Sequence, residues 1–161
     1  MPLDAQQLAE LIETNAGSLR IWIRSRCASS EDVVQEAFCR LAVQDPPPDN
    51  PVAWLYRVCK NLAEKQRTSD SRRRKREQTW AQVNRSRSSG NHGTELSETL
   101  AEIDFLDDDL REVLIARIWG RLSFEEVGQL CDISTATAFR RYETALQSLR
   151  AKLNRQPEER S

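Results

Sequence analysis

The stretch LSFEEVGQLCDISTATAFRRYETALQSL, residues 122–149, decides the fold class of this chain. Ser123 followed three residues later by Glu126 is a capping box, which opens a helix. Gly128 supplies a small residue where helices can cross closely, and Ser134 is placed to cap a second, longer helix after a tight turn. Apolar side chains recur along one side of that helix, at Ala138, Tyr142, Ala145, Leu146, Leu149 and Leu153. The spacing predicts a helix-turn-helix pair.

The composition of the 161 residues is that of a helical, soluble protein. Hydrophobic residues make up 39% and charged residues 30%, with 5 Gly and 6 Pro, which excludes collagen-like and wholly disordered chains. There is no run of 18 apolar residues, and the first residues lack the basic start and apolar core of a signal peptide. We therefore expect a cytoplasmic protein with no membrane insertion.

Cysteine and histidine usage argues against metal and redox chemistry. The four cysteines, Cys27, Cys39, Cys59 and Cys131, never form a C-x-x-C pair. The single histidine, His92, lies in a stretch rich in Gly, Ser and Asn with no orienting carboxylate. We expect mostly packed, reduced thiols, no metal, no cofactor and no catalytic histidine.

Three amphipathic helices are predicted in the first half of the chain. Asp4 caps the first of them, and we expect an interruption at Gly17. The second follows Ser29, and the third begins where Asn50 is followed by Pro51, a capping residue and a residue suited to the first helical position. No strand pattern appears in the sequence. The predicted fold class is all-α.

Composition divides the chain into two modules. Residues 85–94 offer no apolar face to bury, which indicates a tether. We predict a three- to four-helix bundle over residues 1–82, a flexible linker over 83–96, a helix-turn-helix domain over 97–155 and a tail over 156–161. Residues 65–87 hold nine basic and two acidic residues, whereas residues 95–109 hold seven acids and no base. The basic segment would favour a polyanion that the acidic one repels, although two solvated surfaces are the ordinary alternative.

The second helix carries a polar patch opposite its apolar side. Asp32, Gln35 and Glu36 lie at i, i+3 and i+4, so they share one face. No pocket-forming residues surround these carboxylates on the open helix surface, so the sequence does not indicate acid-base catalysis here. The patch favours docking of a basic partner, with simple solvation as the alternative.

The third helix combines an aromatic ring, an amide and a cation on its outward face, at Trp54, Asn61 and Lys65. Stacking surfaces and cations along one track suit single-stranded nucleic acid. The arginine run of residues 72–76 extends the track. The alternative is that Trp54 packs on the first helix and the arginines form a solvated tail.

The last helix presents polar side chains opposite its apolar stripe, at Thr137, Arg140, Arg141 and Thr144. These residue types suit contacts with phosphates and base edges in a major groove. An ordinary solvated helix remains the alternative for this face.

Three motifs together resemble a known family. They are DVVQEAF at residues 32–38, WLYR at 54–57 continuing to Asn61, and LSFEEV at 122–127 before the helix-turn-helix. In order and spacing the chain is similar to the extracytoplasmic-function (ECF) group of bacterial RNA polymerase sigma factors. The resemblance covers region 2, about residues 5–80, and region 4, about residues 97–153.

The resemblance implies a non-enzymatic initiation factor that takes core RNA polymerase to a −35 and a −10 element and helps to open the strands. It implies docking of Asp32, Gln35 and Glu36 on the clamp helices of the largest subunit, region 4 on the flap of the second-largest subunit, and an anti-sigma factor. The helix bearing Trp54 and the loop of residues 67–72 after it would capture an unstacked base of the single-stranded −10 region. The implied −10 contacts are Trp54, Arg57, Asn61, Lys65, Arg67, Ser69, Arg72, Arg73 and Arg74. The implied −35 duplex contacts are Thr135, Thr137, Arg140, Arg141 and Thr144.

Some positions depart from the family pattern. Ala136 stands where the family often has Gly, and Phe139 stands where a basic residue is frequent. Thr144 and Leu146 stand where Arg often occurs. Glu64 would have to point aside from DNA or pair with Lys60.

Two other functions compete with this interpretation. One is a helix-turn-helix repressor that acts on duplex DNA alone, and it leaves the Asp32 patch and Trp54 unexplained. The other is a small enzyme or RNA-binding adaptor, which only the arginine run supports.

Overall fold

The computed structural model describes residues 1–76 and 102–155, with side chains described for 1–69 and 102–155. Its helices are α1 (Ala5–Arg24), α2 (Ser30–Val43), α3 (Pro51–Arg76), α5 (Asp108–Ile118), α6 (Phe124–Cys131) and α7 (Thr135–Arg155). The described residues contain no strand, so the all-α fold class is confirmed. The predicted linker, 83–96, and tail, 156–161, lie outside the described residues. None of the described helices is long and apolar enough to span a membrane.

Local capping starts the helices where the sequence predicts. The Asp4 side chain accepts the Gln7 N–H, and the Gln7 side chain accepts the Asp4 N–H in return. Before α3, the Ala53 N–H donates to Asn50 Oδ1 at 3.1 Å. These side chains satisfy backbone donors that have no partner within the first helical turn.

The two helices predicted around the turn at residues 132–134 are present as α6 and α7. Ser123 and Glu126 make both hydrogen bonds of the capping box at the start of α6. Asp132 ends that helix in the left-handed conformation, at φ 58°. Ser134 then accepts the Thr137 N–H at 3.1 Å and caps α7. Three residues, 132–134, therefore join the two helices.

The predicted interruption at Gly17 is wrong, because α1 runs unbroken from Ala5 to Arg24. The neighbouring Ser18 is fully buried, donates its hydroxyl proton to the Asn15 carbonyl at 3.1 Å and accepts from the Tyr56 hydroxyl at 3.4 Å. Ser18 is thus hydrogen-bonded both within α1 and to α3, and the Gly-Ser pair does not break the helix.

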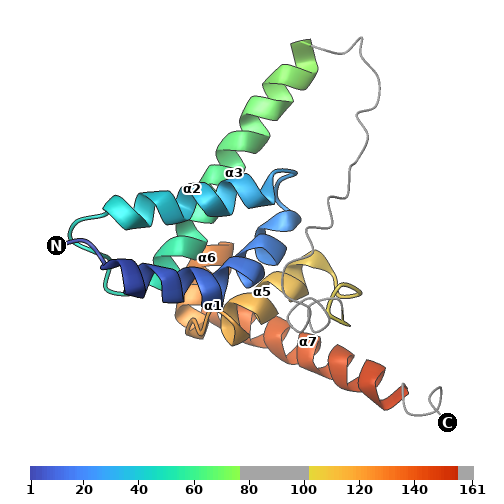
Figure 1. Ribbon diagram of the computed structural model, residues 1–161. Helices are drawn as coiled ribbons and strands as arrows, with labels where there is room; N and C mark the ends of the chain where they lie inside the picture. Colours follow the sequence, from blue (N-terminus) through green and yellow to red (C-terminus); the bar gives the residue numbers. More distant parts are fainter. Residues whose placement is uncertain (77–101, 156–161) are drawn as a thin grey trace.

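The predicted loop over residues 67–72 is also wrong, because α3 continues to Arg76. Neither Gly nor Pro occurs between Val52 and Arg76, and most residues after Ala63 are good helix formers. The Thr68 hydroxyl donates to the Glu64 carbonyl at 3.0 Å, so this polar side chain is accommodated within the helix. Figure 1 shows the end of α3 extending away from the packed body.

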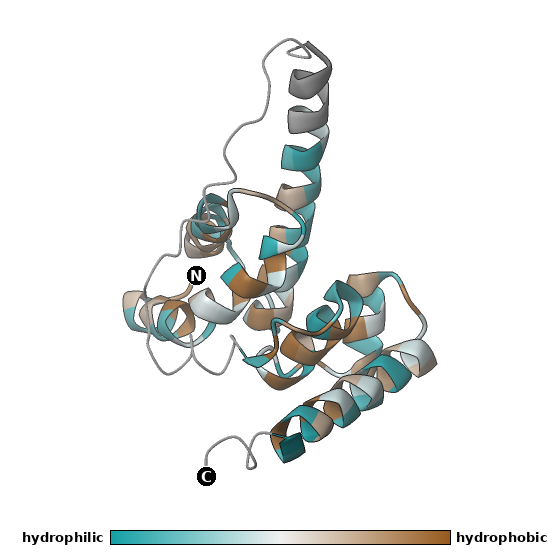
Figure 2. Ribbon diagram, turned by 90° about the vertical axis from the view of Figure 1, so that its right-hand side faces the viewer, coloured by the Kyte–Doolittle hydropathy of each residue, from teal (hydrophilic) through white to brown (hydrophobic). Residues whose placement is uncertain are grey.

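Two layers of helices share a continuous hydrophobic core. In the first half, α1, α2 and α3 pack on one another, and the Trp22 and Tyr56 rings meet edge to face at 5.1 Å. In the second half, α5, α6 and α7 do the same. Figure 2 shows apolar residues gathered where helices meet and polar residues along the projecting part of α3.

The two halves pack against each other, which the sequence does not predict. Helix α1 contacts α5, and α3 contacts α6. All six residues of α5 from Arg111 to Ala116 are buried, so this helix has no wholly solvent-facing side along that stretch. The division into domains at 1–82 and 97–155 stays a prediction.

We predict that Gly128→Ala lowers the free energy of unfolding by about 1–3 kcal/mol. A Cβ at this position would lie 2.8 Å from the Ile133 carbonyl oxygen, a backbone atom of the turn that would have to shift. Chemical denaturation measures the change, with Gln129→Ala, an exposed neighbour in the same helix, as the control. A variant as stable as the wild type would show that the turn tolerates the methyl group.

Candidate functional site

The polar patch of α2 lies on the surface. Asp32, Gln35 and Glu36 are exposed, while Val33, Val34, Ala37, Phe38 and Leu41 are buried on the other side of the helix. Arg40 Nε donates to Glu36 Oε1 at 3.0 Å, and both side chains are about half exposed. Such an i, i+4 surface pair contributes only about 0.3–0.5 kcal/mol, so a partner can replace it at little cost. The patch is open to a macromolecule.

The outward face of α3 carries the predicted polar groups but not a free indole. Arg57, Asn61 and Lys65 are exposed. Trp54 is partly buried and packs against the hydrophobic core. Only part of its ring is therefore free for stacking. The outcome is intermediate between the exposed position predicted for Trp54 and the alternative in which it packs on the first helix.

The projecting part of α3 carries further predicted residues. Arg67 and Ser69 are exposed there. Arg72, Arg73 and Arg74 belong to α3, but their side chains lie outside the described part. Because the segment is helical, the predicted polar residues of this region lie on one continuous helix rather than on a helix and a loop. They are Arg57, Asn61, Lys65 and the arginines after them.

Lys60 does not pair with Glu64. Its ammonium group donates to the Leu130 carbonyl at 2.5 Å and to the Asp132 carboxylate at 2.7 Å, both in the second half of the chain. Glu64 is exposed. Hydrogen bonding and the positive charge of Lys60 hold the pKa of Asp132 below its usual value.

The predicted face of α7 is part exposed and part packed. Thr135, Arg140 and Thr144 are exposed, and Thr137 and Arg141 are half-buried. Thr137 Oγ1 accepts hydrogen bonds from the Ser134 hydroxyl at 2.8 Å and from Arg140 Nη2 at 3.2 Å. This network holds the Arg140 guanidinium near the start of the helix, which is the end that reads bases in helix-turn-helix proteins.

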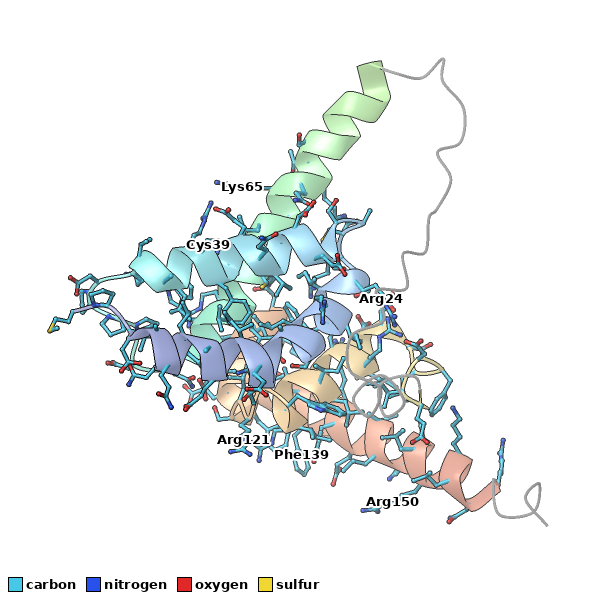
Figure 3. The ribbon with its side chains drawn as sticks, viewed as in Figure 1. Arg24, Cys39, Lys65, Arg121, Phe139 and Arg150 are labelled. Carbon is cyan, nitrogen blue, oxygen red and sulfur yellow. The ribbon has the colours of Figure 1, made fainter. Side chains whose placement is uncertain are left out.

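The start of α7 also presents an aromatic ring that the sequence analysis left out of the site. Phe139 is 45% exposed and meets Phe124 edge to face at 5.2 Å. The Arg117 guanidinium lies 4.6 Å from the Phe124 ring centre and also donates to the Leu122 carbonyl at 2.8 Å. In the view of Figure 3, Phe139 and Lys65 lie on opposite sides of the molecule. The one feature of the sequence that could have drawn attention to Phe139 is that it stands where the family often has a basic residue.

Thiol environments differ along the chain. Burial raises the pKa of the Cys59 thiol to about 12 and that of Cys131 to about 11, because desolvation disfavours the thiolate. Cys39 is exposed on α2, on the same side as Gln35 and Glu36. Within the described ranges no three His, Cys, Asp or Glu residues are grouped as a metal would need.

Comparison with known proteins connects this arrangement to a family. No protein-family model matches the chain. The ECF RNA polymerase sigma factor EcfG of Rhodopseudomonas palustris (strain TIE-1) is 32% identical over 132 residues, which cover 77% of this chain and 71% of that protein. The chain belongs to the ECF RNA polymerase sigma factors. Like other members, this sigma factor directs transcription.

A solved structure supports the fold of this sigma factor. It is the sigma factor RpoE in complex with the anti-sigma factor NepR from Bartonella quintana. The TM-score is 0.57 at 18% identity, over 94% of this chain and 98% of that one. The resemblance stated from the sequence motifs is therefore confirmed at the level of family and of the all-helical fold.

We predict that iodoacetamide at about pH 8 modifies Cys39 and leaves Cys59 unmodified in the native sigma factor. The Cys59 thiolate is scarce at that pH because the raised pKa lies well above it, whereas an unfolded cysteine has a pKa of about 8.5. Peptide mass spectrometry measures the modification, with the chain in denaturant as the control. Equal labelling of both thiols in the native state would contradict the packing of α3.

Proposed function

We propose that this sigma factor binds core RNA polymerase through the exposed face of α2 and recognises its promoter through α3 and α7. The observation that carries the proposal is the presence of three chemically different outward faces, one on each of these helices. Each of the three helices turns apolar side chains into the core, so the polar faces are not needed for folding. A repressor of duplex DNA would leave the α2 patch unused.

The α2 face suits a basic protein surface. Asp32 and Glu36 bring two carboxylates one helical turn apart, and Gln35 adds an amide donor and acceptor beside them. Exposed carboxylates steer a cationic partner and set its orientation. We assign this face to the clamp helices of the largest polymerase subunit, and α5–α7 to the flap of the second-largest subunit.

The α3 face suits the non-template strand of the −10 element. Arg57, Lys65 and Arg67 supply cations for phosphates, and Asn61 supplies an amide that can hydrogen-bond to a base edge. The partly exposed Trp54 ring offers a stacking surface, an interaction worth about 1–3 kcal/mol per base. Ser69, Arg72, Arg73 and Arg74 continue the same helix toward the opened strand.

The α7 face suits the duplex of the −35 element. Thr135, Thr137, Arg140, Arg141 and Thr144 are the proposed contacts, and Arg140 is the one held in place by a hydrogen bond from its own guanidinium to Thr137. A placed arginine can bind guanine through two hydrogen bonds in the major groove. Thr144 donates its hydroxyl proton to the Arg140 carbonyl at 2.9 Å, so its proposed contact with DNA is as a hydrogen-bond acceptor.

The polymerase supplies the chemistry in this proposal, and the sigma factor itself catalyses no reaction. We place its action in the cytoplasm. Residues 1–82 and 97–155 are its two proposed domains, for −10 and −35 recognition respectively. An anti-sigma factor is a further proposed partner, by analogy with the complex of RpoE and NepR.

We predict that D32K combined with E36K weakens binding to core polymerase roughly tenfold or more, because two attractive charges become repulsive. The α2 core residues are untouched, so the helix content measured by circular dichroism should not change. E13K, a reversal at an exposed acid of α1, is the matched control. Wild-type affinity of the double variant would remove the docking assignment.

Core polymerase should also protect Cys39 from alkylation, because this exposed thiol lies one helical turn beyond Gln35 and Glu36 on the same side of α2. Duplex promoter DNA without polymerase should leave its rate of alkylation unchanged. The rate is measured by mass spectrometry of the Cys39 peptide. Protection by DNA alone, or none by polymerase, would place the docking surface elsewhere.

We predict that N61A reduces opening of the −10 region while the holoenzyme keeps its affinity for a −35 duplex. Asn61 is exposed, so the truncation removes a contact without opening a cavity. Permanganate reactivity of unpaired thymines measures opening, on a promoter selected from random DNA by the holoenzyme. Unaltered reactivity would exclude Asn61 from strand capture.

A further inference from the structure

One exposed aromatic ring has no role in the contacts proposed above. Phe139 is 45% exposed and lies near the start of α7, one residue before Arg140. Phe105 is the other exposed aromatic residue among the described side chains, and the Lys152 ammonium group lies 4.3 Å from its ring centre. Phe105 is thus engaged within the chain, whereas Phe139 stands at the end of the helix that is proposed to enter DNA.

The ring of Phe139 is held in place by its neighbours. It meets the Phe124 ring edge to face, with the two centres 5.2 Å apart. Phe124 in turn meets the Tyr142 ring at 5.4 Å, and the Arg117 guanidinium lies 4.6 Å from its ring centre. A side chain that is already positioned loses little conformational freedom when it binds a ligand. Phe139 therefore offers a preorganised apolar surface at the edge of the molecule (Figure 3).

The residues around Phe139 suit base edges better than phosphates. Ala136, Phe139 and Arg140 are all exposed, and their i, i+3 and i+4 spacing places them on one side of α7. Glu143 follows one turn later and is also exposed. Two uncharged side chains and an acid attract no phosphate, so Arg140 is the cation on this side of the helix.

The chemistry of the major groove offers one partner for an apolar side chain. Each base pair presents hydrogen-bond donors and acceptors there, and the apolar group among them is the C5 methyl of thymine, which phenylalanine and alanine can contact. Stacking is the other use of an aromatic ring, but the bases of an intact duplex already stack on one another, and separating them is costly. A ring on a helix in the groove is therefore suited to a thymine methyl group.

We propose that Phe139 determines specificity at the −35 duplex by packing its ring on the methyl group of a thymine, with the Ala136 methyl beside it. The proposal rests on the proposed function, because it requires α7 to enter the major groove. Phe139 stands where the family often has a basic residue, so an apolar contact here takes the place of a charged one. The −35 element of this sigma factor then contains a thymine close to the base that Arg140 contacts.

The test removes the methyl group from the DNA. The holoenzyme formed by the full chain and core polymerase selects −35 duplexes from random DNA, and each thymine on either strand is then replaced in turn by deoxyuridine. Deoxyuridine lacks only the C5 methyl, so base pairing is kept. Affinity is measured for the wild type, for F139A and for F105A, the matched control at the other exposed phenylalanine.

We expect one deoxyuridine replacement to weaken binding by the wild type and by F105A about three- to fourfold, the value of one buried methyl-sized group. The same replacement should leave binding by F139A unchanged, because the ring and the methyl belong to one contact.

A second variant covers the loss of the Phe124 contact in F139A. F139R keeps a long side chain at this exposed position, and it should bind thymine and deoxyuridine duplexes equally well. Helix content by circular dichroism checks that both variants are folded.

Two results would overturn the proposal while leaving the proposed function intact. One is that no deoxyuridine replacement weakens binding by the wild type although R140A does weaken it, and the other is that the replacement weakens F139A and F139R as much as the wild type. If R140A and F139A both bind the selected duplex like the wild type, α7 does not read the −35 element, and the proposed function fails together with the proposal.

Discussion

The structure depends on the burial of α5 between the two halves. Six consecutive residues, Arg111 to Ala116, are buried, so this short helix offers one side to α1 and others to α6 and α7. Two of the six are charged and need partners, because an unpaired buried charge is costly. Arg111 binds the carbonyls of Asp104 and Leu106 and pairs with Asp108, and Glu112 binds Arg26 of the first half.

In this arrangement the side chains that form the core are different from those proposed to bind polymerase and DNA. Apolar side chains of α2, α3 and α7 face inward, which leaves the acidic patch of α2, the basic track of α3 and the polar side of α7 outward. Each face uses a different helix, so each proposed contact is carried on a rigid element. The acidic face and the basic track also keep the proposed polymerase and DNA contacts electrostatically distinct.

What the sequence predicts well is local. The capping side chains at Asp4, Asn50 and Ser123 act on backbone groups three residues away, so a short window of sequence contains the whole interaction. The outward position of Asp32, Gln35 and Glu36 follows equally from helical periodicity, as does the burial of the residues opposite. Family membership also followed from short motifs in a fixed order.

What the sequence does not predict is the choice of distant partners. Periodicity indicates which side of α3 is buried but not that Lys60 at its margin binds a turn 70 residues later in the chain. In two places the sequence predicts a break that does not occur. At Gly17 the helix continues, and its neighbour Ser18 is packed against α3. After Ala63 the helix continues because most of the residues there are good helix formers. Trp54 was placed outward because a ring at a margin can pack either way.

The most direct test of the account is a cryo-electron microscopy structure of the chain bound to core RNA polymerase and promoter DNA. The account predicts that α2 contacts the polymerase through Asp32 and Glu36, that α3 lies on an unpaired strand, and that α7 lies in the major groove of a duplex far from it. A complex in which α2 faces solvent, or in which α3 lies on paired duplex DNA, would contradict it.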